Sequence, residues 1–271
     1  MLKKAKCKGC GDSYFVNEMY RVDSPSKNYF YVCEICNDRM LPYHETNDKI
    51  VRKPAKHGIT IGIELETSYR DTQSNVLYQY GFIPTEDSTV ICEWKSPIFQ
   101  NIRGLSKMFR SIEKYIEIDS SCGTHINVGT FEPEEMQYIR RFYHSLFVPL
   151  SDCMKNFDIE TTELFGRYFN RWAYPVDRDS YPTSHTNFIN VEAENRLEFR
   201  LAYFKNAEQF MKCLKFCIDV TKCIKTNFIR HFNKEGLDNE CLLKHRRHKA
   251  SITANKLVHI FSKYMDIDIA A

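Results

Sequence analysis

Residues 59–66 read Ile-Thr-Ile-Gly-Ile-Glu-Leu-Glu, a strict alternation of apolar positions with polar or glycine positions. Successive side chains of a β-strand point to opposite faces of its sheet, so the four aliphatic residues share one face. Glu64 and Glu66 then lie on the other face, two residues apart. The pattern predicts a strand with one buried face and one face that carries carboxylates. A solvated strand face has the same pattern, so this stretch alone leaves the role of the carboxylates open.

Two later stretches combine apolar backing with polar chemistry in the same way. Residues 86–97 predict a turn and a strand that ends at Pro97, with Glu93 between two apolar neighbours. Residues 122–129 predict a strand with His125 and Asn127 on one face and apolar residues on the other. An edge strand would explain the glutamate, and a hydrogen-bonded core histidine would explain the imidazole. Read functionally, both patterns indicate a ligand or metal site.

A fourth predicted strand, residues 195–203, carries charges of both signs on one face. Glu198 lies between Arg196 and Arg200, while the alternate positions are apolar. A salt-bridge ladder within the strand is the simpler interpretation. The functional interpretation is a metal-binding carboxylate beside arginines that neutralise phosphate oxygens.

Together the four strands carry one set of potential metal ligands, namely Glu64, Glu66, Glu93, His125 and Glu198. A set rich in carboxylate oxygens favours Mg²⁺ or Mn²⁺ over Zn²⁺. Several carboxylates on one apolar-backed face would repel one another without cations. Divalent ions beside arginines indicate phosphoryl transfer.

Composition sets the class of protein. The 271 residues are 43% hydrophobic and 14% aromatic, which provides a substantial core and excludes disorder as the main state. Thirty-eight basic against thirty-five acidic residues give a net charge of +3, too balanced to indicate a nucleic-acid partner by charge alone. No apolar stretch approaches the length of a membrane span and no signal peptide is recognisable, so we expect a soluble, cytoplasmic protein without a membrane partner.

The N-terminal segment contains two Cys-x-x-Cys pairs: Cys7, Cys10, Cys33 and Cys36. Two such pairs can supply four thiolates to one tetrahedral Zn²⁺. The eleven cysteines are an odd number and are mostly scattered singly, which favours a reducing compartment and metal binding over disulfides. The sequence therefore predicts a zinc ribbon at residues 1–40, a polar linker at 41–58 and one domain at 59–271. Helical spacing predicts covering helices near residues 105–116, 133–150 and 206–228.

The order of these motifs resembles the amidoligase family. The resemblance rests on Gly62-Ile63-Glu64-Leu65-Glu66, Asp87-Ser88 with residues 93–97, residues 122–129 and residues 196–200, over about residues 59–230. It implies an α+β fold, a glutamine-synthetase-like antiparallel sheet with covering helices. It also implies an ATP-dependent carboxylate–amine ligase that forms an amide through an acyl phosphate.

The resemblance also implies residue roles. The ligands that bridge the nucleotide phosphates through Mg²⁺ (or Mn²⁺) would be Glu64, Glu66, Glu93, His125 and Glu198. Arg200 would stabilise the transferring phosphoryl group, so that Arg200, Glu93 and Glu198 form the catalytic set. Contacts to ATP or the substrate carboxylate would come from Arg167, Arg171, Arg196, Arg200 and Asn127.

The partners are then ATP, a carboxylate and an amine, and the amine or carboxylate could belong to a peptide or protein. Residues 244–249, Lys-His-Arg-Arg-His-Lys, could contact nucleic acid, as could the ribbon, although a solvated helix face is the simpler interpretation. The alternative function is a non-catalytic zinc-ribbon adaptor that binds nucleic acid or protein.

The zinc site gives the first testable prediction. Protein purified without chelator should contain about one zinc ion per chain by elemental analysis, and Cys33→Ser should lose that zinc. Cys213→Ser, which changes a cysteine outside the two pairs, should keep it. Wild-type protein that contains no zinc would contradict the prediction.

Overall fold

The chain forms two compact units in a computed structural model. The model describes residues 4–6, 13–16, 19–24, 27–33, 59–67, 77, 80–87, 90–99, 102, 105–114, 116, 118, 122–231 and 240–267. The first unit contains Met1–Gly58 and Gly62–Cys122, and the second contains Ile59–Ile61 and Gly123–Ala271. One boundary follows residue 58, where we expected the main domain to begin, and another falls at residue 122, inside that expected domain. The predicted linker at 41–58 lies outside the described residues.

Two short antiparallel pairs begin the first unit. They are formed by β1 (Lys4–Lys6) with β2 (Ser13–Phe15), and by β3 (Met19–Ser24) with β4 (Lys27–Cys33). Cys33 is the last residue of β4. Cys7, Cys10 and Cys36 lie outside the described residues, and the zinc site stays a prediction.

Three strands of the first unit carry the acidic residues. They are β5 (Thr60–Thr67), β6 (Ile83–Asp87) and β7 (Val90–Lys95), which are neighbours in the order β6-β7-β5 and pair antiparallel. The sequence analysis missed β6, because Pro84 cannot donate to a β-ladder; a proline is accommodated here because β6 is an edge strand. The helix predicted at 105–116 is α4 (Leu105–Ile112), whose buried residues are Leu105, Met108, Phe109 and Ile112.

The second unit has its own antiparallel strands. They are β8 (Thr124–Gly129), β9 (Ile189–Asn190) and β10 (Arg196–Phe199), in the order β8-β10-β9. We expected the last strand to continue to residue 203. It ends at Phe199, although the backbone N–H of Arg200 still donates to the carbonyl oxygen of Phe188 (2.8 Å). Gly129 is needed at the end of β8, since a Cβ there would lie 2.4 Å from Oγ1 of Thr60.

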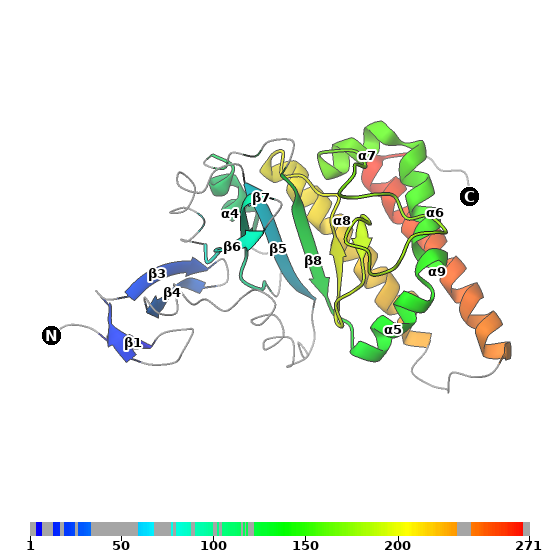
Figure 1. Cartoon of the computed structure of the whole chain (residues 1–271), viewed down its shortest axis with the longest axis horizontal. Helices are drawn as coiled ribbons and strands as arrows, with labels where there is room; N and C mark the ends of the chain where they lie inside the picture. The colour runs from blue at the N-terminus through cyan, green and yellow to red at the C-terminus, as the bar shows by residue number, and fades with distance from the viewer. Residues whose placement is uncertain are drawn as a thin grey trace. The chain divides into compact units, whose positions relative to one another are not determined.

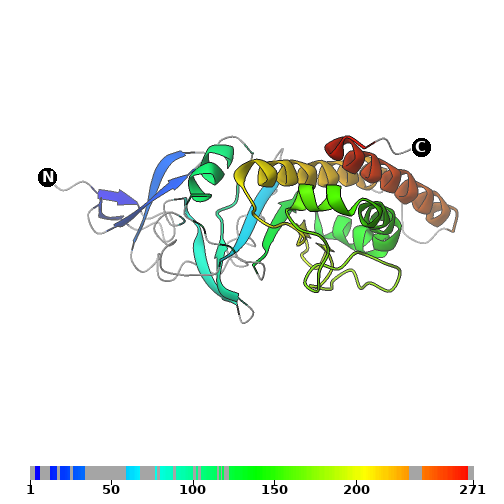
Figure 2. The same cartoon turned by 90° about the horizontal axis from the view of Figure 1, so that it is seen from above.

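Helices cover the apolar side of these strands. They are α5 (Pro133–Arg141), α6 (Tyr143–Asn156), α7 (Asp158–Phe165), α8 (Ala207–Asn227) and α9 (Glu240–Met265), with a 3₁₀ turn at Ile229–His231. Helix α8 packs on β8 (Figure 1), and α9 runs beside α8 and α6 (Figure 2). The apolar residues of β8 and β10, Ile126, Val128, Leu197 and Phe199, are fully buried.

The helix predicted at 133–150 is divided in two. Phe142 leaves helical geometry between α5 and α6 (φ −109°, ψ 17°), and its ring packs edge-on against Phe228 with centroids 5.5 Å apart. This tertiary contact is invisible to helical spacing, which both helices satisfy.

The described residues therefore form a mixed α/β structure with antiparallel strand pairs and six α-helices, compatible with the predicted α+β class. Among these helices none combines the length and apolar character that crossing a membrane requires.

Helix α8 begins as the sequence predicted, and this start can be tested. The side chain of Asn206 accepts a hydrogen bond from the backbone N–H of Gln209 (2.8 Å). Asn206→Ala should lower the free energy of unfolding by about 1 kcal/mol in chemical denaturation, because it leaves this N–H without its cap. Asn206→Asp, which keeps an acceptor oxygen, should stay near wild type. Equal losses in both variants would show that the cap is not what Asn206 contributes.

Candidate metal and anion site

Two buried glutamates face each other across β5 and β7. Glu66 is the register partner of Glu93, and their exposed fractions are 8% and 4%. Directly opposed side chains on antiparallel strands share a face and lie close together, and like charges in this position repel. Burial strengthens the repulsion because water no longer screens it. This pair therefore favours a bound cation.

Lys95 compensates part of this charge. Its Nζ lies 3.0 Å from Oε1 of Glu93, and it is the register partner of Glu64. Glu64, Glu66 and Glu93 are all buried on this face of the strands.

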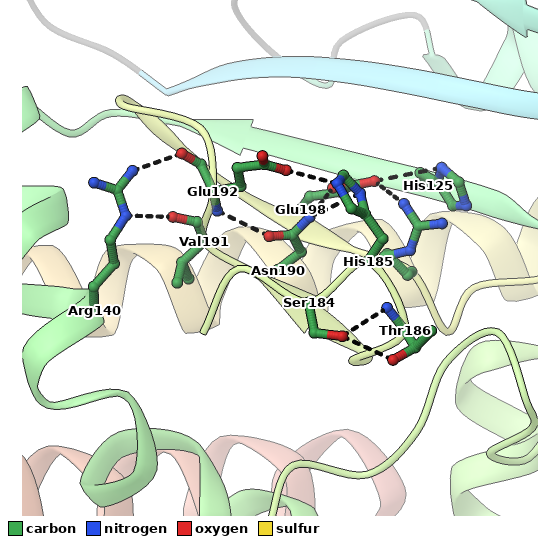
Figure 3. A network of polar contacts seen from close by, with 10 residues as sticks. His125, Arg140, Ser184, His185, Thr186, Asn190, Val191, Glu192 and Glu198 are labelled. Atoms are coloured by element: carbon green, nitrogen blue, oxygen red, sulfur yellow. Dashed lines mark hydrogen bonds and ion pairs between the residues drawn. The ribbon is translucent and has the colours of Figure 1, made fainter. Parts of the chain in front are cut away.

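In the second unit, three side chains hold the carboxylate of Glu198. Its Oε1 lies 2.5 Å from Nη1 of Arg200 and 3.5 Å from Nδ1 of His125. Its Oε2 accepts a hydrogen bond from Nδ2 of Asn190 (3.0 Å). Figure 3 shows Glu198 with His125 on one side and with Asn190 and His185 on the other. The carboxylate is fixed in position, and Oε2, with one hydrogen bond, keeps a lone pair that can bind a metal ion.

The predicted acidic residues and His125 form two groups with metal-ligand spacing. One consists of Glu64, His125 and Glu198, and the other of Glu66, Glu93 and His125. Within each group the potential ligand atoms all lie within 4.8 Å of one another. The described residues thus contain a possible carboxylate–histidine metal-binding group made of the five residues that the sequence singled out. Its donor set, mostly carboxylate oxygen, fits Mg²⁺ or Mn²⁺.

Arg200 adds an anion-binding feature beside this group. Its buried Nε–H has no hydrogen-bond partner in the part of the chain that the structure describes, although its Nη1 is paired with Glu198. A buried donor without an acceptor is costly, so this N–H is suited to an anionic ligand. Arg167 supports the same segment, because its guanidinium donates to the carbonyl oxygens of Arg200 and Leu201 (both 3.1 Å).

The remaining residues predicted to contact ATP or substrate are Arg196, Asn127 and Arg171. Arg196 donates from Nε to Oδ1 of Asn127 (2.9 Å), so these two predicted residues hold each other. Arg171 is exposed, and its guanidinium lies over the ring of Trp172, 4.8 Å from the centroid. A nucleotide role for either arginine remains a proposal.

The basic segment 244–249 lies in α9. Four of its side chains, Lys244, His245, Arg247 and His248, are exposed. Arg246 is buried, and its guanidinium lies 5.6 Å from the ring centroid of Tyr138. The segment therefore lies mainly on an exposed helix face, and nucleic-acid contact stays a prediction.

Sequence reasoning missed Asn190, which donates to Glu198, and the neighbouring pair His185 and Glu192. Nε2 of His185 lies 2.8 Å from Oε2 of Glu192. The signal available was weak, because β9 is only two residues long. Tyr143 anchors β9 by donating from its hydroxyl to the carbonyl oxygen of Ile189 (2.6 Å). Burial raises the pKa of this hydroxyl, which therefore stays protonated and able to donate.

Comparison with known proteins identifies no relative: no protein-family model matches the chain, and no curated protein matches it.

The opposed pair Glu66 and Glu93 predicts the direction in which a substitution changes stability. In chelator, Glu66→Gln should be more stable than wild type by about 0.5 kcal/mol in the free energy of unfolding and should therefore melt at a higher temperature. The reason is that the variant removes one of two repelling charges. With Mg²⁺ or Mn²⁺ added, the variant should gain less stability than wild type, because it has lost a ligand. Thermal melts with and without the cation measure both effects.

The matched control is Glu163→Gln, which changes an exposed glutamate of α7. It should match wild type with and without the cation. A Glu66→Gln variant that melts earlier in chelator, or that keeps the full stabilisation by metal, would contradict a cation site here.

Proposed function

We propose that the protein is an ATP-dependent carboxylate–amine ligase that forms an amide through an acyl phosphate. The observation that carries the proposal is the pairing of a carboxylate–histidine group with the arginine at position 200, whose Nε–H lacks an acceptor. Carboxylates that hold divalent cations, beside an arginine that binds phosphate oxygen, are common features of phosphoryl-transfer sites. The ordered motifs that resemble the amidoligase family support the same reaction.

In this proposal, Glu64, Glu66, Glu93, His125 and Glu198 hold Mg²⁺ or Mn²⁺, which neutralises the ATP phosphates when bound. Arg200 binds an equatorial oxygen of the γ-phosphoryl group as it moves to the substrate carboxylate. The bond from the γ-phosphorus to the bridging oxygen of ADP breaks, and a bond to the carboxylate oxygen forms. The amine then attacks the carbonyl carbon, and inorganic phosphate leaves with a proton from the amine.

The glutamine-synthetase-like arrangement of the sheet and the zinc ribbon belong to the same proposal. The polar face of an antiparallel sheet backed by helices provides a rigid platform for such a site. Zn²⁺ at the four N-terminal cysteines would stabilise a segment too small for a large core.

Titration calorimetry of ATP with and without Mg²⁺ tests the proposal. We expect nucleotide binding that requires the metal. A non-catalytic adaptor should show none, so metal-independent or undetectable ATP binding would reject the ligase.

The roles of two residues separate catalysis from stability. Glu198→Ala should weaken Mg²⁺-dependent ATP binding, because it removes a metal ligand. Arg200→Ala should keep most of that binding but lower carboxylate-dependent ADP release by about 10³-fold, because its charge matters most during transfer. ATP calorimetry, ADP release and melting temperature are measured on both variants.

A purely structural Glu198–Arg200 pair predicts another outcome. Both variants would then lose about 1 kcal/mol of stability or less and keep ADP release. Arg178→Ala, which changes an exposed arginine of the same unit with no proposed role, serves as the control for loss of a positive charge.

A further inference from the structure

We infer that Asn190 is a positioning residue, which sets the carboxylate of Glu198 for metal binding. The inference rests on the proposed function, since it concerns how one of the proposed ligands is held. Asn190 has an exposed fraction of 2% and is the register partner of Glu198 in the β9–β10 pair. It therefore meets Glu198 from a neighbouring strand, in the interior of the second unit.

The hydrogen bonds of Asn190 determine which way its amide points. Its Oδ1 accepts from the backbone N–H of Glu192 (2.8 Å), and its Nδ2 donates to Oε2 of Glu198 (3.0 Å). The reversed amide would place its oxygen against the carboxylate and its NH₂ group against the peptide N–H. Both contacts would be repulsive, so only the observed orientation satisfies the two neighbours.

This donor fixes the plane of the carboxylate. Oε1 of Glu198 accepts a hydrogen bond from Arg200, and Oε2 accepts one from Asn190, so both oxygens of the carboxylate are held in place. A ligand that cannot rotate loses less conformational entropy when a metal binds. Groups that orient metal ligands in this way commonly change metal affinity 10- to 100-fold when mutated.

Arg140 supports the orientation of Asn190 by holding the turn that follows β9. The guanidinium of Arg140, on α5, donates to the carbonyl oxygens of Val191 (2.8 Å), Glu192 (2.6 Å) and Ala193 (3.2 Å). These bonds immobilise the turn whose N–H group holds Oδ1 of Asn190, as Figure 3 shows. Arg140 thereby acts on Glu198 through three successive hydrogen bonds, by way of Glu192 and Asn190, without touching it.

His185 closes the same network from the exposed side. Its Nδ1 lies 3.5 Å from Nδ2 of Asn190 and its Nε2 lies 2.8 Å from Oε2 of Glu192. His185 therefore links Asn190 to Glu192, on the turn that follows β9.

The test uses Mn²⁺ alone as the probe, followed by electron paramagnetic resonance, so no substrate need be known. Asn190→Ala should bind Mn²⁺ about tenfold more weakly than wild type. The matched control is Asn187→Ala, because Asn187 is also buried (3%) but donates to Tyr143 and to the carbonyl oxygen of Tyr181. This control should lose stability but keep its Mn²⁺ affinity.

Arg140→Ala serves as a second variant, because it leaves every proposed ligand and Asn190 in place. It should weaken Mn²⁺ binding by about threefold, less than the direct change. If Asn190→Ala fails to fold, the Arg140→Ala result decides, and an unchanged affinity there overturns the inference.

The outcomes separate the two levels of the proposal. Wild-type protein that binds no Mn²⁺ would overturn the proposed metal site and the inference with it. Wild-type protein that binds Mn²⁺ as tightly as folded Asn190→Ala would overturn the positioning role and leave the proposed function standing. Equal losses in Asn190→Ala and Asn187→Ala would also overturn it, since general loosening of the segment would then be the cause.

Discussion

The burial of like charges on an apolar-backed sheet face is the constraint on which the rest of the structure depends. Glu66 and Glu93 oppose each other directly, with Glu64 on the same strand face and Lys95 paired with Glu93. Such a face costs free energy in the folded protein unless a cation compensates it. A fold selected for stability alone would place apolar residues there. The strands on this face are therefore better understood as a scaffold for charged ligands.

The second unit meets a similar cost with fixed hydrogen bonds. Glu198 is held at both oxygens, by Arg200 and Asn190, and the backbone at Arg200 is held in turn by Arg167 and the carbonyl oxygen of Phe188. Most of these supports come from segments without regular secondary structure. The irregular stretch between α7 and β10 thus contributes rigidity to the site, because its polar groups form hydrogen bonds with partners that are themselves held in place.

Alternation in the sequence predicted the strands and the faces of their polar residues, because a period of two is a local property of the chain. It located Glu64, Glu66, Glu93, His125 and Glu198, which have metal-ligand spacing in the structure. It could not find the break at Phe142, whose ring packs against Phe228, a partner distant in sequence. Strand β6 was missed because Pro84 is tolerated only at a sheet edge, and edge position is a property of the assembled sheet.

Asn190 illustrates why the support of a site is harder to predict than its ligands. A ligand is identified by its own chemistry, since a carboxylate on an apolar-backed strand needs an explanation wherever it occurs. A supporting amide is ordinary until its two partners are known, and those of Asn190 are a peptide N–H two residues ahead and a carboxylate eight residues ahead. The register of β9 against β10 creates this juxtaposition, and β9 is too short to show a period. The orientation of Glu198 is thus a property of the folded second unit, which no single stretch of the sequence encodes.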